Sequence, residues 1–309
     1  MKFLYIIGNG FDLHHKMNTG YTAFRDWLED NNSSVLTTID ELFGYCDSDW
    51  WKRFEENLAT AVTSEIVKEE VQENYPDFGS DDFRDADWYA AEYAVEGILS
   101  DAYGIIKDAF NCWIANVPMG DEDRKIDLIT DEAVFLTFNY TSTLEDLYNI
   151  SDDKILHIHG KAGTGDELIL GHGVSADEIE SILEADYPTD EEEGDDYVVQ
   201  NAKRAAINGV YNQRKNVEEI ISKHEEWFNS LNEVTHIYIY GHSLGGVDVP
   251  YFEKILSVVK RKDVRIEVSD YNDDNKTTIE EFMKREGIGV EQYSIINLED
   301  KMSSRLQSQ

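Results

Sequence analysis

The sequence is poor in cysteine, in basic residues and in long apolar runs. Its only cysteines are Cys46 and Cys112, which excludes a disulfide framework and a four-cysteine zinc ribbon built from this chain alone. No segment approaches the ~18 consecutive apolar residues of a membrane-spanning helix. The first apolar run, Phe3–Ile7, is too short for a signal peptide. These absences predict a soluble, cytoplasmic protein.

Charge of one sign dominates the composition. The 309 residues include 27 Lys and Arg against 64 Asp and Glu, which gives a net charge of −37. A surface this acidic repels phosphates, so we expect neither broad nucleic-acid binding nor contact with an anionic membrane, although a local basic groove stays open. Six Trp, 13 Phe and 17 Tyr are ample for a core. At ~150 residues per domain, the length suits one large domain or two smaller ones.

Short, nearly continuous apolar runs predict a parallel sheet. Such runs are typical of strands covered on both faces, and several of them end in Gly or Asn before a helical pattern. That order is typical of α/β folds whose site lies at the carboxyl ends of the strands. We therefore predict an α/β fold with a Rossmann-like parallel sheet. The expected strands are Phe3–Ile7, Val134–Thr137, Ile155–His159, Leu168–Leu170, His236–Tyr240 and Val264–Val268.

The remaining pattern predicts a helical insertion. Residues 21–125 have helical periodicity, above all in Asp49–Glu73 and Trp88–Asn116. We interpret them as an insertion in a nucleotide-binding domain formed by residues 1–20 and 126–300, with a tail at 301–309. The segment Glu184–Asp196 carries eight acidic residues and no basic ones. A solvated loop is the simpler interpretation, and an inhibitory cover over the site is the alternative.

A glycine-containing turn follows the first expected strand. The stretch Gly8-Asn9-Gly10-Phe11-Asp12 lets backbone approach a ligand closely, and amides at such a turn can hold phosphate. The third glycine of a dinucleotide-binding fingerprint is absent, because Leu13 occupies its position. A plain tight turn explains the motif equally well.

A polar amide follows the second expected strand. Asn139 lies just beyond the run that ends at Thr137, which is where ligands bind in such sheets. Thr141 has a structural alternative, because Thr141 or Ser142 together with Glu145 fits the capping box of the next helix.

Histidines at expected strand ends are candidate bases. His157 and His159 are two residues apart, so on a strand they point to one face. We expect His157 to be a hydrogen-bonded histidine of the sheet. His159 precedes Gly160, where it can reach a cleft and act as a general base. We predict no metal site, because no acidic third ligand stands at a recognisable spacing, and the role of His172 stays open.

One motif matches the nucleophile motif of serine hydrolases. The stretch Gly241-His242-Ser243-Leu244-Gly245 matches the nucleophile elbow and follows an expected strand. In that fold the catalytic histidine comes after the serine, but no histidine lies beyond His242 and only 66 residues follow Ser243. Pro250 would also stand inside the helix that begins at the elbow. These observations argue against a serine hydrolase.

Taken together and in this order, these segments resemble the AbiH family of bacterial phage abortive-infection proteins. The family in turn resembles, more distantly, the sirtuin-like NAD-binding domains of several defence proteins. The matching stretches are IIGNGFDLHH with Thr19–Tyr21, FLTFNYTSTLE, HIHG followed by LILGHG, and IYIYGHSLGGVDVPYF, which span Ile6 to Phe252.

The resemblance implies a role for each motif. The first turn would hold the NAD pyrophosphate, Asn139 would face the nicotinamide ribose, His159 would be the base, and the G-x-S-L segment would contact the adenosine half. The implied site consists of the catalytic residues His159 and Asn139 and the nucleotide-binding residues Gly8, Asn9, Gly10, Phe11, Asp12, Thr137, Gly160, Gly241, His242, Ser243, Leu244 and Asp248.

Two departures from sirtuins refine what the resemblance implies. The Asp that usually follows the T-x-N-x segment and helps to read the nicotinamide amide is Thr141 here, and the zinc ribbon of deacetylating sirtuins is absent. Sirtuin-like defence domains without the ribbon tend to cleave NAD to nicotinamide and ADP-ribose. The implied function is a phage-defence effector that cleaves the N-glycosidic bond of NAD or a related nucleotide, partnered by a phage trigger or a second copy of the chain. A nucleotide-sensing module without turnover, which gates a partner, is the alternative.

Overall fold

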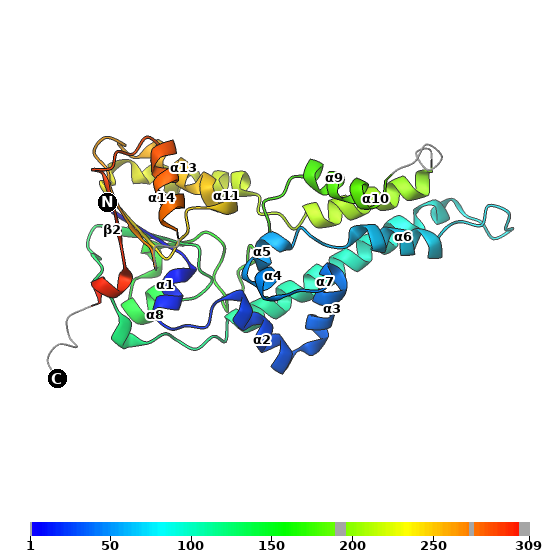
Figure 1. The fold of residues 1–309 in the computed structure, drawn as a ribbon, viewed down its shortest axis with the longest axis horizontal. Helices are drawn as coiled ribbons and strands as arrows, with labels where there is room; N and C mark the ends of the chain where they lie inside the picture. The colour runs from blue at the N-terminus through cyan, green and yellow to red at the C-terminus, as the bar shows by residue number, and fades with distance from the viewer. Residues whose placement is uncertain (1, 189–195, 272–274, 303–309) are drawn as a thin grey trace. The chain divides into compact units, whose positions relative to one another are not determined.

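The chain forms two compact units, which are described separately (Figure 1). The computed structural model describes residues 2–188, 196–271 and 275–302. The middle of the acidic segment 184–196, interpreted as a solvated loop or alternatively as a cover, therefore lies outside the described residues. The sheet-containing unit comprises Met1–Ala23, Asn111–Ile169 and Asn216–Gln309. The helical unit comprises Phe24–Phe110 and Leu170–Lys215. Residues 170–215 thus pack with the helices of the expected insertion.

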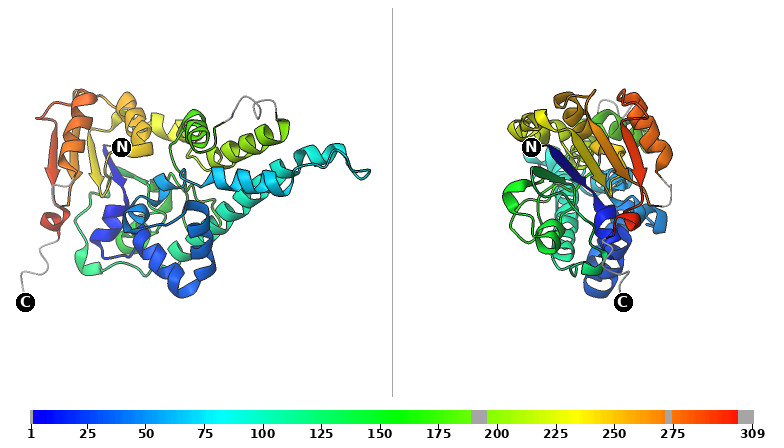
Figure 2. Two further views of the ribbon diagram at one scale, coloured as in Figure 1. Left: turned by 45° about the vertical axis from the view of Figure 1, so that its right-hand side comes forward. Right: turned by 90° about the vertical axis from the view of Figure 1, so that its left-hand side faces the viewer.

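Six parallel strands form the sheet (Figure 2). Their order is β3-β2-β1-β4-β5-β6, which is the strand order of the Rossmann fold. The expected α/β, Rossmann-like fold class is confirmed. The strands are β1 (Phe3–Ile7), β2 (Ala133–Thr137), β3 (Ile155–His157), β4 (His236–Tyr240), β5 (Arg265–Ser269) and β6 (Tyr293–Ile296).

Burial of both sheet faces explains the continuous apolar runs. Successive side chains of a strand point to opposite faces, so Leu4 and Ile6 belong to one buried cluster and Tyr5 and Ile7 to another. The first cluster includes side chains of α11 (Val217–Lys223), α12 (Glu225–Asn229), α13 (Val249–Val258) and α14 (Lys276–Arg285). The second includes side chains of α1 (Asn9–His14) and α8 (Thr143–Tyr148).

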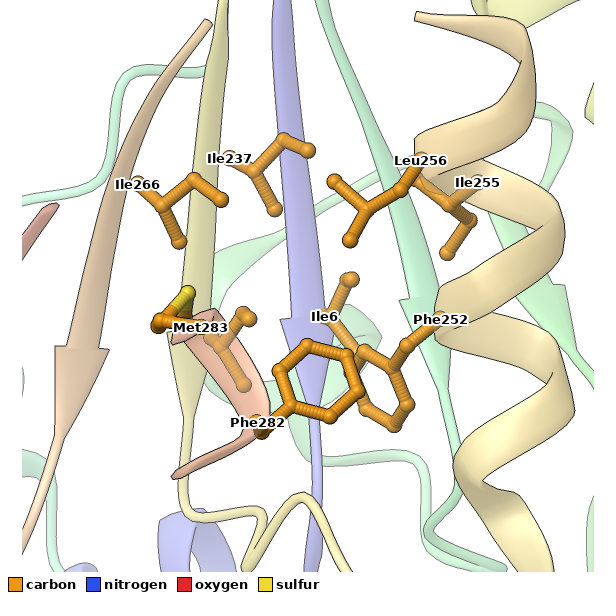
Figure 3. Close-up of a pocket in the computed structure, with 9 residues that line it drawn as sticks. Ile6, Ile237, Phe252, Ile255, Leu256, Ile266, Phe282 and Met283 are labelled. Atoms are coloured by element: carbon orange, nitrogen blue, oxygen red, sulfur yellow. The ribbon is translucent and has the colours of Figure 1, made fainter. Parts of the chain in front are cut away.

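A small gap remains in the first cluster, between the sheet and the helices α13 and α14 (Figure 3). All its lining side chains are apolar, among them Ile6, Phe252 and Met283. Ligand sites need at least a few polar groups to orient what they bind. We therefore interpret the gap as imperfect core packing.

Two predicted strands differ from the structure by more than one residue, and one strand was not predicted. Leu168–Leu170 is not a strand: Ile169 N–H donates to His159 O at 2.9 Å, but the contact does not extend into a ladder. The expected strand Ile155–His159 ends at His157, so His159 stands in the loop that follows. β6 was not expected, because this edge strand is only partly buried and lacks a continuous apolar run.

The helical unit is built around aromatic side chains. Trp51 and Phe54 stack with ring centroids 5.3 Å apart, and Phe24 meets both rings edge to face. The pattern 49–73 does not form one helix, because the chain turns after Asn57 and Val62 N–H donates to Leu42 O, 2.8 Å away. The helices that contribute to this unit are α2 (Tyr21–Asn31), α3 (Ser33–Phe43), α4 (Ser48–Lys52), α5 (Phe54–Asn57), α6 (Thr63–Glu73), η1 (Asp85–Tyr89), α7 (Ala90–Ile114), α9 (Ala176–Asp186) and α10 (Tyr197–Tyr211).

None of the helices in the described part of the chain is long and apolar enough to cross a membrane. Short 3-10 helices are also present in the sheet-containing unit. They are η2 (Glu122–Arg124), η3 (Asp152–Lys154), η5 (Ser230–Glu233), η6 (Gly246–Asp248) and η7 (Leu298–Lys301).

Candidate functional site

The connections that follow the central strands meet at one edge of the sheet. β1 and β4 are neighbours at the point where the strand order reverses, and α/β folds of this order bind ligands there. Gly8 follows β1, Asn139 lies two residues beyond β2, and Gly241 follows β4. All fourteen residues assigned to the site from the sequence belong to the sheet-containing unit.

The two glycine turns touch through their backbones. A Cβ on Gly8 would lie 2.6 Å from Gly241 O, and a Cβ on Gly241 would lie 2.0 Å from Phe11 N. Gly241 also has φ +73°, a conformation that favours glycine. The amides of Gly8 and Gly10 donate to Tyr240 O and Gly241 O, each at 2.9 Å. These glycines therefore let two loops pack closely, and both amides already have acceptors.

Asn139 connects the end of β2 to the first turn. Its backbone N–H donates to Thr137 Oγ1 and its Nδ2 donates to Gly8 O, each at 3.1 Å. The residue is buried, and its Oδ1 has no hydrogen-bond partner within the described part of the chain. A buried acceptor without a donor costs free energy. This oxygen is consequently a place where a ligand hydroxyl or amide would gain a hydrogen bond.

Asp12 is a buried carboxylate held by two threonines. Its Oδ2 accepts from Thr141 Oγ1 at 2.6 Å, and its Oδ1 accepts from Thr143 Oγ1 at 2.7 Å. Burial raises the pKa of Asp12 to about 6, although these hydrogen bonds act in the opposite direction. The capping box expected from Thr141 or Ser142 is not formed, because Ser142 precedes α8 without a side-chain cap and Thr141 is bound to Asp12.

Asp248 stands between two histidines. His159 Nε2 lies 3.7 Å from Asp248 Oδ1, and His242 Nε2 lies 3.5 Å from Asp248 Oδ2. His242 Nδ1 accepts the backbone N–H of Leu244 at 3.0 Å, so neutral His242 carries its proton on Nε2, toward the carboxylate. A carboxylate beside an imidazole orients the ring and stabilises its cationic form. Asp248 is therefore a carboxylate that faces both imidazoles, and its 3.7 Å separation from His159 is longer than a hydrogen bond.

Aromatic rings lie around the two histidines that face Asp248. The ring centroid of Phe138 lies 5.3 Å from that of His159 and 4.6 Å from that of His242, and Tyr251 lies 5.9 Å from His159. Tyr251 is fully buried, and none of the residues that the structure describes forms a hydrogen bond with its hydroxyl. Burial, with the charge of Asp248, raises the pKa of Tyr251. The hydroxyl thus stays protonated at neutral pH, where it can donate a hydrogen bond.

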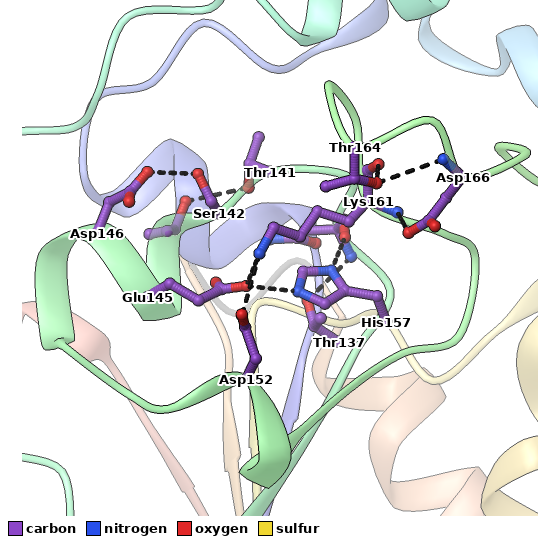
Figure 4. A network of polar contacts seen from close by, with 12 residues as sticks. Thr137, Thr141, Ser142, Glu145, Asp146, Asp152, His157, Lys161, Thr164 and Asp166 are labelled. Carbon is purple, nitrogen blue, oxygen red and sulfur yellow. Dashed lines mark hydrogen bonds and ion pairs between the residues drawn. The ribbon is translucent and has the colours of Figure 1, made fainter.

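His157 belongs to a structural network, as its sequence position predicts (Figure 4). Its Nε2 lies 2.9 Å from Glu145 Oε1, which also accepts from Lys161 Nζ at 2.7 Å. Lys161 donates in addition to Asp152 at 3.1 Å. Burial acts to raise the pKa of Glu145, but the hydrogen bonds from His157 and Lys161 outweigh it and lower the pKa to about 2. The network ties β3 and its following loop to α8.

Other assigned residues lie in the core or are engaged locally. Phe11 and Leu244 are buried in the two core clusters. Asn9 Nδ2 donates to Thr19 O at 3.1 Å, and Asn9 Oδ1 accepts from Thr19 Oγ1 at 2.6 Å. Gly160 has φ +84°.

His172 lies in the helical unit, outside the cluster around Asp248. Its Nε2 is 3.0 Å from Val210 O, and its Nδ1 accepts the backbone N–H of Val174 at 3.0 Å. Both ring nitrogens are therefore engaged by backbone groups of the same unit. Within the described ranges, no three His, Cys, Asp or Glu side chains are grouped so that they could hold a metal ion.

The serine of the hydrolase-like motif is not on a nucleophile elbow. Ser243 is exposed, and α13 begins at Val249 after the short helix η6. An elbow needs the helix to begin directly at the turn that carries the nucleophile. Pro250 instead occupies the first turn of α13, where its missing N–H costs no hydrogen bond.

Sequence reasoning did not include Tyr251 among the candidate site residues, and it did not predict that Asp248 lies next to His159. The spacing of Asp248 and Tyr251, three residues apart across the start of a helix, is a signal that both face one side. It was masked by the stronger G-x-S-x-G match just before it. The bond between Thr141 and Asp12 joins residues 129 positions apart, and no local pattern in the sequence marks it.

Comparison with known proteins adds one match. The family model described as bacteriophage abortive infection AbiH matches residues 4–270. No curated protein matches the chain.

Proposed function

The chain belongs to the AbiH family of bacteriophage abortive-infection proteins, and we propose that its sheet-containing unit binds NAD or a related nucleotide and cleaves the N-glycosidic bond. One observation carries the proposal. Near the reversal point of a sheet in Rossmann order, Asp248 lies next to His159, and the ring of Tyr251 lies 5.9 Å from that of His159. Among the described residues, neither the Tyr251 hydroxyl nor Asn139 Oδ1 on the connection after β2 has a hydrogen-bond partner.

The residues divide the chemistry between them. The bond from ribose C1′ to the nicotinamide nitrogen breaks, and its electron pair leaves with nicotinamide. Water forms the new bond to C1′, and its proton passes to His159, whose imidazolium Asp248 stabilises. Asn139 Oδ1 accepts a ribose hydroxyl and so holds the sugar while positive charge develops at C1′.

Thr141 would take part in binding the nicotinamide amide. Its hydroxyl hydrogen is donated to Asp12, which leaves the oxygen lone pairs to accept an amide N–H. Asp12 thereby supplies, through Thr141, the negative potential that an aspartate at position 141 would supply directly. The nicotinamide amide is a ligand of matching chemistry.

The phosphate contacts need other donors than the glycine amides. Since the amides of Gly8 and Gly10 already donate to backbone carbonyls, we assign the pyrophosphate to the backbone amide of Asn9 and the adenosine ribose to the exposed hydroxyl of Ser243. The positive end of the short helix α1 adds little because it has six residues.

Purified protein incubated with NAD tests the proposal, with nicotinamide and ADP-ribose measured by mass spectrometry. We expect His159→Ala to lower the rate by roughly 10²–10⁴-fold, the usual contribution of a positioned base. His224→Ala is the matched control, because His224 is a partly buried histidine outside the site and should leave the rate unchanged.

Three outcomes separate the alternatives. Turnover that is lost in His159→Ala and kept in His224→Ala supports the enzyme. Nucleotide that copurifies or binds without conversion favours the sensing module. Absence of both binding and turnover, in protein whose circular dichroism is that of a folded α/β chain, overturns the proposal.

A further inference from the structure

Six aromatic rings form a continuous chain on the helical unit. In order, the ring centroids lie 6.0, 4.7, 6.1, 5.9 and 6.3 Å apart. The rings come from the segment after α6, from η1, and from the starts of α7 and α10. We call this set the aromatic strip: it comprises Tyr75, Phe78, Trp88, Tyr197, Tyr89 and Tyr93.

The strip is open to solvent over most of its length. Tyr75, Phe78 and Tyr197 are 46–49% exposed and Tyr93 is 63% exposed. Hydrogen bonds fix two of its tyrosines, because Tyr75 Oη donates to Asp196 at 2.7 Å and Tyr197 Oη donates to Tyr89 Oη at 3.3 Å. Contiguous exposed aromatic surface of this kind marks an interaction site more often than scattered single residues do.

The charge around the strip is mostly negative, although Arg204, which pairs with Glu92 at 3.2 Å, also acts on Tyr197. Between positions 73 and 93 the chain carries seven carboxylates and a single cation, Arg84, whose guanidinium donates to Phe83 O. Asp77, Asp81, Asp82 and Asp85 are exposed in this segment. An aromatic face bordered by carboxylates offers both the ring quadrupoles and the negative potential that attract an organic cation.

We propose that the aromatic strip binds an arginine-rich segment of a partner protein. A guanidinium stacks on aromatic rings and forms forked hydrogen bonds with carboxylates, so one arginine uses both features of the surface. Several rings in line match several arginines along an extended chain. The proposal adds a protein-binding surface to the helical unit and does not depend on the nucleotide chemistry proposed for the sheet-containing unit.

The same charge disfavours other occupants. Phosphates of a nucleic acid would be repelled by the carboxylates, and so would the headgroups of an anionic membrane. A second copy of this chain is disfavoured too, since it carries the same net charge of −37. A cationic polypeptide is the occupant with complementary charge.

Fluorescence anisotropy with a labelled peptide of alternating Arg and Ser tests the proposal, with the Lys–Ser peptide as comparison. A chain this acidic attracts any basic peptide, so the rings must be tested without changing charge. Phe78→Leu combined with Tyr93→Leu keeps the apolar bulk and removes two rings. We expect this variant to bind the Arg peptide about tenfold more weakly and the wild type to prefer Arg over Lys.

Matched variants complete the test. Tyr45→Leu removes a tyrosine that is 93% exposed, lies in the same unit and neighbours carboxylates, but is not part of the strip, so it should leave binding unchanged. Asp81→Asn with Asp82→Asn should weaken binding more than the equally charged control Asp30→Asn with Asp108→Asn. Equal binding by the strip variant and Tyr45→Leu, both folded by circular dichroism, would overturn the proposal in favour of non-specific charge attraction.

Discussion

At the scale of single residues, Asp12 makes an unusual contribution to stability. Its pKa in the folded protein is about 6, against 3.8 for a free side chain. Between these values the folded state holds the proton while the unfolded state has released it, so stability falls as pH rises from 3.8 to 6 and changes no further above 6. Each pH unit in this window removes about 1.4 kcal/mol.

The comparison of wild type with Asp12→Asn isolates this effect. We expect wild type to lose roughly 1.4 kcal/mol relative to the variant between pH 5 and pH 7, measured by urea unfolding with tryptophan fluorescence. His15, whose pKa burial lowers to about 4, gives the opposite slope over the same range, but it titrates alike in both proteins. A difference that is independent of pH would show that Asp12 ionises normally.

How much of the candidate site could be predicted depends on the kind of interaction. Asn139 was predicted as a site residue because a polar amide just beyond an apolar run stands out, and His159 because it precedes a glycine at an expected strand end. His157 was expected to be a hydrogen-bonded histidine of the sheet, and its bond to Glu145 confirms this. Asp12 was predicted among the nucleotide-binding residues of the first turn, and nothing in the sequence indicated that it is buried against Thr141 and Thr143. That contact depends on the packing of β1 beside β2, which no local pattern encodes.

At the scale of elements, the end of α8 offers a sharp test of backbone conformation. Asn149 ends this helix with φ +53° and is exposed, so a side chain there is strained and contributes little packing. Asn149→Gly should raise the free energy of unfolding by roughly 0.5–1 kcal/mol, because glycine adopts this conformation without strain.

The matched substitution at the end of another helix should have the opposite sign. Asn229, also exposed, is the last residue of α12 and has φ −66°. Asn229→Gly should lower the free energy of unfolding by roughly 0.3–0.5 kcal/mol, since glycine gives up more conformational freedom than asparagine in a helical conformation. Urea titrations of the two variants in parallel check both signs. Shifts of the same sign would contradict the role assigned to φ.

Elements could be predicted where their burial is uniform. β1, β2 and β4 lie inside the sheet, are covered on both faces, and have the continuous apolar runs that revealed them. β6 at the edge of the sheet lacks such a run and was missed, while Leu168–Leu170 has one but packs without a ladder. An apolar run predicts that a segment is buried. It predicts a strand correctly only where the buried segment also pairs with a neighbouring strand.

At the scale of the whole molecule, the net charge of −37 opposes folding. Bringing 64 carboxylates into two compact units shortens the distances between like charges, and the repulsion acts over ~30 Å at 0.01 M salt but only ~10 Å at 0.1 M. Salt also weakens exposed ion pairs such as Lys2 with Glu132, but these contribute little. Repulsion should therefore dominate, so that the melting temperature, followed by circular dichroism, rises when NaCl is added.

Replacing Asp77, Asp81, Asp82 and Asp85 by Asn removes four clustered charges. This variant should melt at a higher temperature than wild type at low salt, and its melting temperature should rise less when NaCl is added. A melting temperature that falls with salt in wild type would mean that attractive pairs outweigh the repulsion.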